Sequence, residues 1–499
     1  MGAHGQGSGA QGGSWSLTTS MATVPTEIRF GTDGWRALMA WDYTFENVRF
    51  CAEGVCRLLE ANDMAGHGLS IGYDCRWGSP EFAEEVAKVS TAHGITTYLA
   101  DSIVPTPVLS YSVLHNKAGG GIVITASHNS GLWNGFKYKP DYAGSASQAV
   151  VNELEGYIAE AQADSFVPTM SLADAKSSGV LQRPKMAEAY LSNLSNIVDL
   201  KGISEAGLKV GFDAMHGAGS GYLEAALGSG KTSITSIRGE RNPAFPGMGQ
   251  PEPIAPNLQP TIAAAVNRTY DVVIANDGDA DRLGILDEKG NFISTLSTFA
   301  LLCMYQLEQR NLRGPLVRSI TQSGMIDKLA DLYQVPVHVT DVGFKFVGQV
   351  MMEVNAIAAG EESGGYAFQG NIPERDGILS GLMFLDLMVK TGKRPSELLA
   401  LLYEKVGAHF YDRLDVTLGI NTVKPDITTL VAKPPEHIGG LKVKSTDTPN
   451  TAARFLLEGG FWGLIRPSGT EPLLRIYAEG DSPERVQEML RDLRTAAGV

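Results

Sequence analysis

The sequence has few cysteines, no block of like charges and no apolar run long enough to cross a membrane. Only four of its 499 residues are cysteine, and two of them, Cys51 and Cys56, lie in one apolar stretch with a spacing that suits a helix. We interpret these two as core thiols, because the four cysteines form no disulfide or metal-binding pattern. The sequence therefore predicts a reducing, cytoplasmic setting. A membrane helix needs roughly 20 consecutive apolar residues, and no run approaches that length.

The charge balance argues against a nucleic-acid partner. The formal net charge is −14 and no basic cluster is present. An anionic substrate must therefore be bound by individually placed arginines. Residues 1–23 are rich in Gly, Ser, Thr and Gln and contain no Lys or Arg. This composition lacks the features of a signal peptide and predicts a disordered extension or a cloning remnant.

Strand and helix patterns alternate from about Val24 onward. Apolar β-formers predict strands at Leu69–Tyr73, Ile95–Leu99 and Gly121–Thr125. Between the first two, Ser79 is expected to cap a helix that ends at Gly94. A length of 499 residues with 43% hydrophobic residues predicts three or four domains. Alternation of this kind predicts parallel sheets with helices on both faces.

The same pattern recurs twice, without a repeat in sequence, and then changes. Further strands are expected at 208–213, 271–275, 316–320, 337–339 and 356–359. Helices are expected at 221–227 and 379–390. After Tyr411, strands near 463–465 and 473–478 precede an amphipathic helix at Pro483–Ala496.

Ser127 follows a short apolar strand pattern. The run Gly120–Ile124 gives way to the small and polar residues of Thr125–Asn129. The strand would deliver Ser127 into a turn at its carboxyl end, which is where open α/β sheets bind ligands. Ser127 is therefore a candidate nucleophile.

A second loop carries three alternating carboxylates. Asp277, Asp279 and Asp281 can converge on one hard cation, and Arg282 can offset the remaining negative charge. An EF-hand calcium loop is the alternative, because Glu288 falls at the twelfth position. Against it, Arg282 stands where the sharp turn needs glycine, and β-type runs flank the loop.

A third loop, Arg466–Pro472, combines groups that bind phosphate. It offers the guanidinium of Arg466, the hydroxyls of Ser468 and Thr470, and the unhindered amide of Gly469. By itself this grouping is equally compatible with a capped surface turn.

Two further segments are less specific. Gly360–Gly365 follows an apolar run, so Glu361 and Ser363 are candidates for binding sugar hydroxyls. Phe30–Arg36 is a turn-rich segment with Arg36 at its end, and for this segment alone an ordinary glycine turn beside an exposed arginine is the better interpretation.

Together, these loops resemble the four signature loops of the α-D-phosphohexomutase family. The resemblance rests on residues 125–129, 277–282, 360–364 and 466–472 in this order, and residues 30–36 resemble the amino-terminal motif. It implies an α/β fold of four domains around a central cleft, with three related α/β sheet units and a smaller α+β C-terminal domain. We place the domains at 24–170 with the phosphoserine loop, 171–294 with the metal loop, 295–408 with the sugar loop and 409–499 with the phosphate loop.

The resemblance also implies residue roles. Ser127 would be the phosphoserine and Lys137, in Asn134–Lys137, would handle protons. One Mg²⁺ per chain would be bound by Ser127, Asp277, Asp279 and Asp281. The catalytic residues would be Ser127, His128, Lys137 and Arg36. The substrate-binding residues would be Arg282, Lys345, Glu361, Ser363, Arg466, Ser468, Gly469, Thr470 and Arg475. A hexose 1,6-bisphosphate would be the intermediate and activator.

Departures from the family pattern bear on the sugar. Ser130 stands where many members have proline, which we consider harmless. Gly365 stands where the mannose-handling branch often has histidine, and Glu362 is more typical of phosphoglucomutase-like members. The sequence therefore favours glucose 1-phosphate and glucose 6-phosphate as the substrates.

Several alternatives remain at this point. A phosphomannomutase or phosphoglucosamine mutase would use the same mechanism. A metal-dependent phosphatase would use the same serine and aspartates, although no second histidine-rich metal site accompanies them. A non-catalytic sugar-phosphate sensor would normally lack the serine or an aspartate. We expect small sugar phosphates as partners, no nucleic acid or membrane, and a monomer or homodimer.

Overall fold

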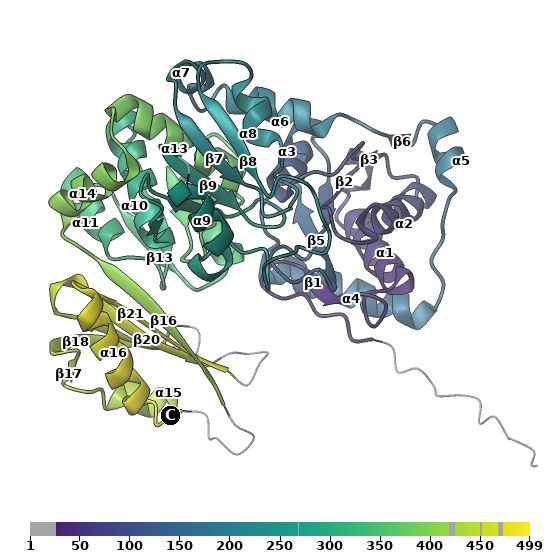
Figure 1. The fold of residues 1–499 in the computed structure, drawn as a ribbon. Helices are drawn as coiled ribbons and strands as arrows, with labels where there is room; N and C mark the ends of the chain where they lie inside the picture. The colour runs from purple at the N-terminus through teal and green to yellow at the C-terminus, as the bar shows by residue number, and fades with distance from the viewer. Residues whose placement is uncertain (1–25, 268, 419–424, 450–451, 468–472) are drawn as a thin grey trace, which may run out of the picture.

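The structure is a computed structural model that describes residues 26–267, 269–418, 425–449, 452–467 and 473–499. Its strands form four sheets, surrounded by helices (Figure 1). The extension expected at residues 1–23 lies outside the described residues. Within the described ranges, no helix is long and apolar enough to cross a membrane.

The first sheet has six strands in the order β1-β5-β4-β2-β3-β6. The strands are β1 (Trp35–Leu38), β2 (Leu69–Tyr73), β3 (Thr97–Leu99), β4 (Gly120–Ile124), β5 (Trp133–Pro140) and β6 (Leu181–Gln182). Helices α1, α2 and α4 cover one face, and α3 covers the other (Figure 1). They are α1 (Phe45–Ala61), α2 (Ser79–Ala92), α3 (Thr106–Asn116) and α4 (Gln148–Asp164), and α5 (Leu172–Ser177) leads to β6. Strand β2 has the predicted bounds.

The cap predicted for α2 is wrong. Its N-cap is Gly78, in a left-handed conformation with φ 70°. The Ser79 hydroxyl instead donates to Asp74 Oδ1 at 2.9 Å. The Ser79 hydroxyl therefore bonds to the buried carboxylate of Asp74, just after β2, and not to the first backbone N–H groups of α2.

The second and third sheets have five and four strands, in the orders β11-β10-β9-β7-β8 and β13-β12-β14-β15. The second contains β7 (Lys209–Asp213), β8 (Ser233–Ile237), β9 (Val272–Asn276), β10 (Leu283–Leu286) and β11 (Phe292–Ile293). The third contains β12 (Leu316–Ser319), β13 (Val337–Thr340), β14 (Ala358–Gly360) and β15 (Tyr366–Phe368). The helices that accompany the second are α6 (Met186–Leu194), α7 (Leu200–Glu205), α8 (Tyr222–Leu227) and α9 (Gln259–Asn267). Those of the third are α10 (Thr295–Met304), α11 (Met325–Tyr333), α12 (Phe344–Glu353), α13 (Gly377–Thr391) and α14 (Pro395–Val406).

One hairpin recurs in all three sheets. The parallel strands β4, β9 and β14 are each followed by a loop and then by an antiparallel partner, β5, β10 or β15. The prediction of parallel sheets is therefore wrong for these three strand pairs, although the neighbouring pairs β2–β4, β7–β9 and β12–β14 are parallel. The reason is that each partner follows directly from a polar loop, with no intervening helix, and an antiparallel pair needs only a short connection. The three loops of these hairpins are the ones that the sequence singled out.

The fourth sheet is wholly antiparallel, in the order β16-β21-β20-β19-β18-β17. Its strands are β16 (Phe410–Thr417), β17 (His437–Ile438), β18 (Leu441–Asp447), β19 (Ala453–Leu457), β20 (Trp462–Pro467) and β21 (Leu473–Gly480). Its helices are α15 (Ile427–Ala432) and α16 (Pro483–Ala496), and α16 has the predicted bounds. This unit is the α+β domain expected at the carboxyl end (Figure 1).

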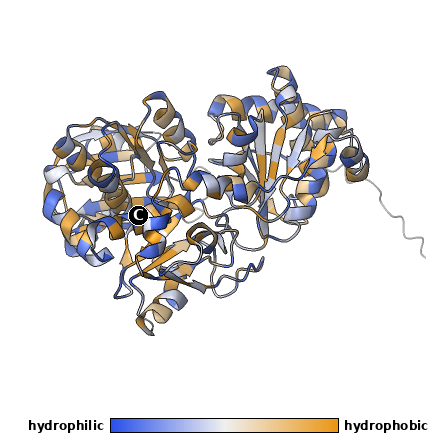
Figure 2. Cartoon of the chain, turned by 90° about the horizontal axis from the view of Figure 1, so that it is seen from above, coloured by the Kyte–Doolittle hydropathy of each residue, from blue (hydrophilic) through white to orange (hydrophobic). Residues whose placement is uncertain are grey.

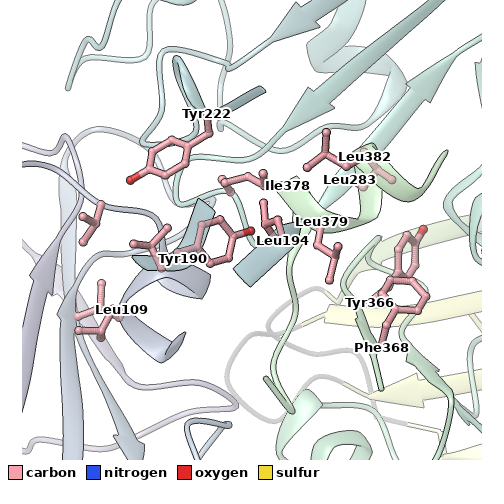
Figure 3. Close-up of a cluster of buried hydrophobic side chains, with 14 of the residues drawn as sticks. Leu109, Tyr190, Leu194, Tyr222, Leu283, Tyr366, Phe368, Ile378, Leu379 and Leu382 are labelled. Atoms are coloured by element: carbon pink, nitrogen blue, oxygen red, sulfur yellow. The ribbon is translucent and has the colours of Figure 1, made fainter. Parts of the chain in front are cut away.

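The first three units share one apolar core, whereas the fourth has its own core and a smaller cluster that it shares with Ile320 of the third unit. A single cluster of buried side chains runs from the first sheet into the third, and a separate cluster fills the fourth unit. Figure 3 shows this continuity where Leu109 of α3, Tyr190 of α6 and Leu379 of α13 lie along one apolar layer. Apolar colouring marks the sheet strands, and polar colouring is frequent on the outer helices (Figure 2). The shared core fixes the first three loops relative to one another.

Candidate active site

The structure brings the serine loop and the aspartate loop into contact. Ser127 is fully buried, and its Oγ lies 3.2 Å from Asp277 Oδ2. Its backbone has φ 51°, a left-handed conformation that is uncommon for a residue other than glycine. The Ser127 amide donates to Thr125 Oγ1 at 2.9 Å. The turn thus directs the hydroxyl of Ser127 toward the carboxylates.

The three aspartates form a compact, fully buried group. One carboxylate oxygen from each of Asp277, Asp279 and Asp281 lies within 4.8 Å of the others. Burial, together with the charges of Asp281 and Asp279, raises the pKa of Asp277 well above its usual value. Repulsion of this kind is what a divalent cation relieves.

The donor set fits a metal ion. Oδ1 of Asp279 and Oδ1 of Asp281 are buried without a hydrogen-bond partner. The second oxygen of Asp279 accepts from Thr106 Oγ1 at 2.6 Å and from Lys137 Nζ at 2.9 Å. Hard carboxylate oxygens suit Mg²⁺, so the orphaned oxygens agree with the predicted site. The EF-hand alternative is wrong, because strands β9 and β10 flank the loop where helices would be required.

A buried cluster of positive charges faces the aspartates. Lys137 Nζ lies 2.8 Å from Asp33 Oδ2, 2.9 Å from Asp279 Oδ2 and 3.3 Å from Asp281 Oδ2. Burial alone would lower the pKa of Lys137, but the carboxylates of Asp279, Asp33 and Asp281 outweigh it and raise this pKa. Arg375 Nη2 adds an ion pair with Asp281 at 3.0 Å. Lys137 therefore holds a proton next to the metal-binding group.

Sequence reasoning missed part of this cluster, namely Lys139, Glu374 and Arg375. Lys139 Nζ lies 2.8 Å from Asp33 Oδ1 and 2.6 Å from Glu374 Oε2. Asp33 Oδ2 also accepts a hydrogen bond from Arg375 Nη2 at 2.5 Å, and the two residues are 342 positions apart in the chain. Asp33 lies inside the turn-rich segment quoted above, so a signal existed there. Glu374 and Arg375 have no local signature.

Arg282, His128 and Arg36 border the serine. Arg282 Nη2 lies 3.0 Å from His128 Nδ1, and Arg282 Nη1 pairs with Glu252 Oε1 at 2.6 Å. Burial and the charges of Arg282 and Arg36 hold the pKa of His128 well below its usual value. Arg36 Nη1 donates to Asn129 Oδ1 at 2.9 Å. The predicted basic residues thus lie around the serine loop, and the imidazole beside Ser127 is neutral.

The third hairpin loop contacts the segment that carries Lys345. Glu361 is buried, and its Oε1 accepts from the Gly343 amide at 2.9 Å. Lys345 Nζ donates to Gln148 Oε1 at 2.7 Å, which connects the third unit to the first. Ser363 is half-buried. The predicted sugar-binding residues therefore come from one region of the third unit.

Two arginines of the predicted phosphate site lie on the fourth sheet. Arg466 on β20 is directly opposite Arg475 on β21. On its other side, Arg475 is directly opposite Asp415 on β16. Ser468, Gly469 and Thr470 lie outside the described residues.

These features define a class of enzymes that move a phosphoryl group on a sugar, the phosphohexomutases. Family models for phosphoglucomutase/phosphomannomutase match four segments: domain I at residues 27–165, domain II at 188–290, domain III at 297–406 and the C-terminal domain at 427–496. A phosphoglucomutase/phosphomannomutase from Thermococcus kodakarensis is 30% identical, with 92% of this chain and 96% of that protein covered. The chain belongs to the phosphoglucomutase/phosphomannomutase family.

Other similar proteins agree with this assignment. A phosphoglucomutase from Staphylococcus aureus is 28% identical, with 92% of this chain and 90% of that protein covered. The solved structure of a provisionally named phosphomannomutase from Thermus thermophilus is 30% identical and has a TM-score of 0.81. The match covers 95% of this chain and 100% of that one. The protein is therefore a hexose-phosphate mutase, an enzyme that transfers phosphate intramolecularly.

Proposed function

We propose that this enzyme interconverts glucose 1-phosphate and glucose 6-phosphate through a phosphorylated Ser127. The contact between Ser127 Oγ and Asp277 Oδ2, 3.2 Å apart, carries the proposal. This contact places the hydroxyl beside the three aspartates, of which Asp279 and Asp281 each have a buried Oδ1 atom without a hydrogen-bond partner. Held by the phosphoserine and the three aspartates, Mg²⁺ would neutralise charge on the transferring phosphoryl group.

The reaction conserves phosphate. The free hydroxyl of the bound sugar attacks the phosphorus of phosphoserine 127, the bond to Ser127 Oγ breaks, and the hydroxyl proton leaves. The resulting 1,6-bisphosphate reorients in the site and returns its other phosphoryl group to Ser127. Lys137, a buried cation 2.9 Å from Asp279, is our candidate for the proton exchange: it would donate its proton to Ser127 Oγ as the bond to phosphorus breaks and, once neutral, accept the proton of the sugar hydroxyl. His128 Nδ1, 3.4 Å from Ser127 Oγ, and Arg36, next to Asn129, would orient the serine loop.

The proposal that the sugar is glucose rests on two residues of the third loop, Gly365 and Glu362. A side chain at Gly365 would collide with Arg375, which is itself held by Asp33, Asp281 and Glu374. Histidine, as in the mannose-handling branch, does not fit there. Glu362 Oε1 accepts from Tyr411 of the fourth unit at 2.7 Å. This hydrogen bond gives Glu362, the residue typical of phosphoglucomutase-like members, a contact with the fourth unit. In that unit, Arg466 and Arg475 would anchor the phosphate that does not react.

Substitution of Ser127 by Ala tests the proposal. Intact-mass analysis of the wild type should show a species heavier by about 80 Da, one phosphate, that is absent from Ser127→Ala. Coupled assays with glucose, mannose and glucosamine 1-phosphates should give the highest kcat/KM for glucose 1-phosphate. Wild-type turnover by Ser127→Ala would contradict the nucleophile. Net release of inorganic phosphate would indicate a phosphatase, and a preference for mannose or glucosamine would correct the sugar.

A further inference from the structure

A fully buried arginine lies beneath the serine loop and is not part of the site described so far. Arg76 follows strand β2, the neighbour of β4, and its side chain is 0% exposed. Among the described residues, its guanidinium has no hydrogen bond or ion pair with the three aspartates of the metal loop or with a predicted substrate-binding residue. It lies instead against the backbone of the loop that carries Ser127.

Every N–H group of this guanidinium has an acceptor. Nε donates to Asp74 Oδ2 at 3.0 Å. Nη2 donates to the carbonyl oxygens of Ser127 and Asn129, both at 2.6 Å. Nη1 donates to those of Ser130 at 2.7 Å and Trp133 at 3.0 Å. An arginine has five such groups in a fixed planar fork, so this one guanidinium donates to four carbonyl oxygens of residues 127–133.

The Ser127 backbone explains why this turn needs support. Its left-handed conformation is disfavoured for a residue with a Cβ atom, and such conformations persist only where the surroundings determine them. The Ser127 carbonyl points to Arg76, while its hydroxyl points to Asp277. The two hydrogen bonds therefore fix the residue from both sides.

The second unit completes the enclosure of Arg76. The ring of Phe245 lies 4.9 Å from the guanidinium carbon, a distance typical of a cation–π contact. A side chain on Gly131, in the same loop, would collide with the Pro243 carbonyl. The serine loop is thus held between Arg76 and residues 243–245, which belong to the unit that also carries the aspartates.

We propose that Arg76 is a positioning residue that sets the backbone conformation of Ser127 and thereby aims its oxygen at the metal-binding aspartates. This inference rests on the proposed role of Ser127. The partners of Arg76 include none of the described residues that we assign to sugar or remote phosphate binding, so we expect it to act on the transfer step and to leave substrate binding unchanged. Lysine has three donors on a flexible stem and leaves carbonyl oxygens of the turn unsatisfied.

The test is the kinetics of Arg76→Lys against a matched control. The control is Arg57→Lys on α1, which pairs with Glu53 at 2.9 Å and with Asp164 at 2.8 Å in the same domain, away from the loop. We expect kcat to fall about a hundredfold in Arg76→Lys with an unchanged KM for glucose 1-phosphate, since a misplacement near 1 Å has that effect on a transfer step. Arg57→Lys should keep both constants. Rephosphorylation of the dephosphorylated enzyme by glucose 1,6-bisphosphate, followed by intact mass, should slow by a similar factor only in Arg76→Lys.

The outcomes separate this inference from the proposed function. A wild type that carries phosphate, with a folded Arg76→Lys variant of normal kcat, would overturn only the positioning role. A proportional rise in KM would do the same, because it would indicate damage to substrate binding. A wild type without phosphate on Ser127 would overturn both. If Arg76→Lys does not fold, Asp74→Asn, which keeps the shape but removes the charge facing Nε, should lower kcat with KM unchanged, and a normal kcat would reject the proposal.

Discussion

Gly278 lies so close to Ser127 that a Cβ atom on Gly278 would be 2.5 Å from the Ser127 carbonyl oxygen. The first and second hairpin loops therefore touch through their backbones as well as through Ser127 Oγ and Asp277. This contact requires glycine in the metal loop for steric reasons, because its φ is not in the left-handed region. The relative placement of nucleophile and carboxylates depends on it.

We predict that Gly278→Ala separates the two loops and lowers kcat by about ten- to a hundredfold, as expected for a displacement below or near 1 Å. Thermal unfolding should show a folded protein. The matched control is Gly156→Ala in α4, where an added Cβ meets no atom within 4 Å. That variant should have wild-type activity and a slightly higher Tm, since alanine is a better helix former. Normal kcat in Gly278→Ala would show that the loops can adapt.

A second prediction concerns the cation. Asp279→Asn retains the shape but removes one negative charge from the group with orphaned oxygens. We expect weaker Mg²⁺ binding by calorimetry and a rate loss of at least about a hundredfold, on the scale of a lost metal interaction. Asp426→Asn is the control, because Asp426 caps α15 in the fourth unit and asparagine caps equally well. Full activity of Asp279→Asn without added Mg²⁺ would refute the metal assignment.

A third prediction uses the buried carboxyl group of Asp376. It caps α13 and accepts from Tyr190 of the second unit at 2.8 and 2.9 Å. Burial raises its pKa from an ordinary value of 3.8 to about 6. Between those two pH values the folded protein retains a proton that the unfolded chain has lost. The free energy of unfolding therefore falls as pH rises through this window, by about 3 kcal/mol in total, and this contribution is constant above pH 6.

Asp376→Asn isolates this effect, because asparagine can still cap the helix and accept from Tyr190. Denaturant unfolding of both proteins from pH 4.5 to 7.5 should show the variant gaining stability relative to the wild type up to about pH 6. Other titrating groups are common to both proteins and cancel in the difference. Parallel stability profiles would mean that the carboxyl group of Asp376 titrates normally.

The sequence predicted the elements whose signals are local. Strand β2 and helix α16 have the expected bounds, and Ser127 lies at the end of its strand as the apolar run indicated. The four loops were found because each concentrates its polar groups within a few consecutive residues. Local signals of this kind need no knowledge of the tertiary fold.

The missed features depend on long-range pairing. Strand β5 contains Lys137 and Lys139, both fully buried, so its pattern does not resemble that of a core strand. Burial of two lysines is possible only because Asp33, Asp279 and Glu374 meet them from distant parts of the chain. Nothing in the local sequence shows which carboxylates will be neighbours.

The last prediction concerns Arg466, which faces Arg475 across two strands of the fourth sheet. A mutase of this type binds the same sugar in two orientations, so the phosphate that is not reacting needs an anchor each time. The binding energy of that remote phosphate can then contribute to the transfer step. Arg466→Ala should therefore lower kcat/KM in both directions by about ten- to several-hundredfold, the equivalent of a charge-assisted contact worth roughly 1.5–3 kcal/mol.

Two observations would separate this role from a general loss of charge or structure. Intact mass should show that Arg466→Ala still carries phosphate on Ser127, because the donor site is untouched. Arg491→Ala, which removes the same charge from the exposed side of α16 in the same unit, should keep wild-type kinetics. Stabilisation by added glucose 1,6-bisphosphate, measured as the rise in Tm, should be smaller in Arg466→Ala than in the wild type. An Arg466→Ala enzyme with normal kcat/KM in both directions would assign the 466–472 loop to the surface and remove the remote anchor from the mechanism.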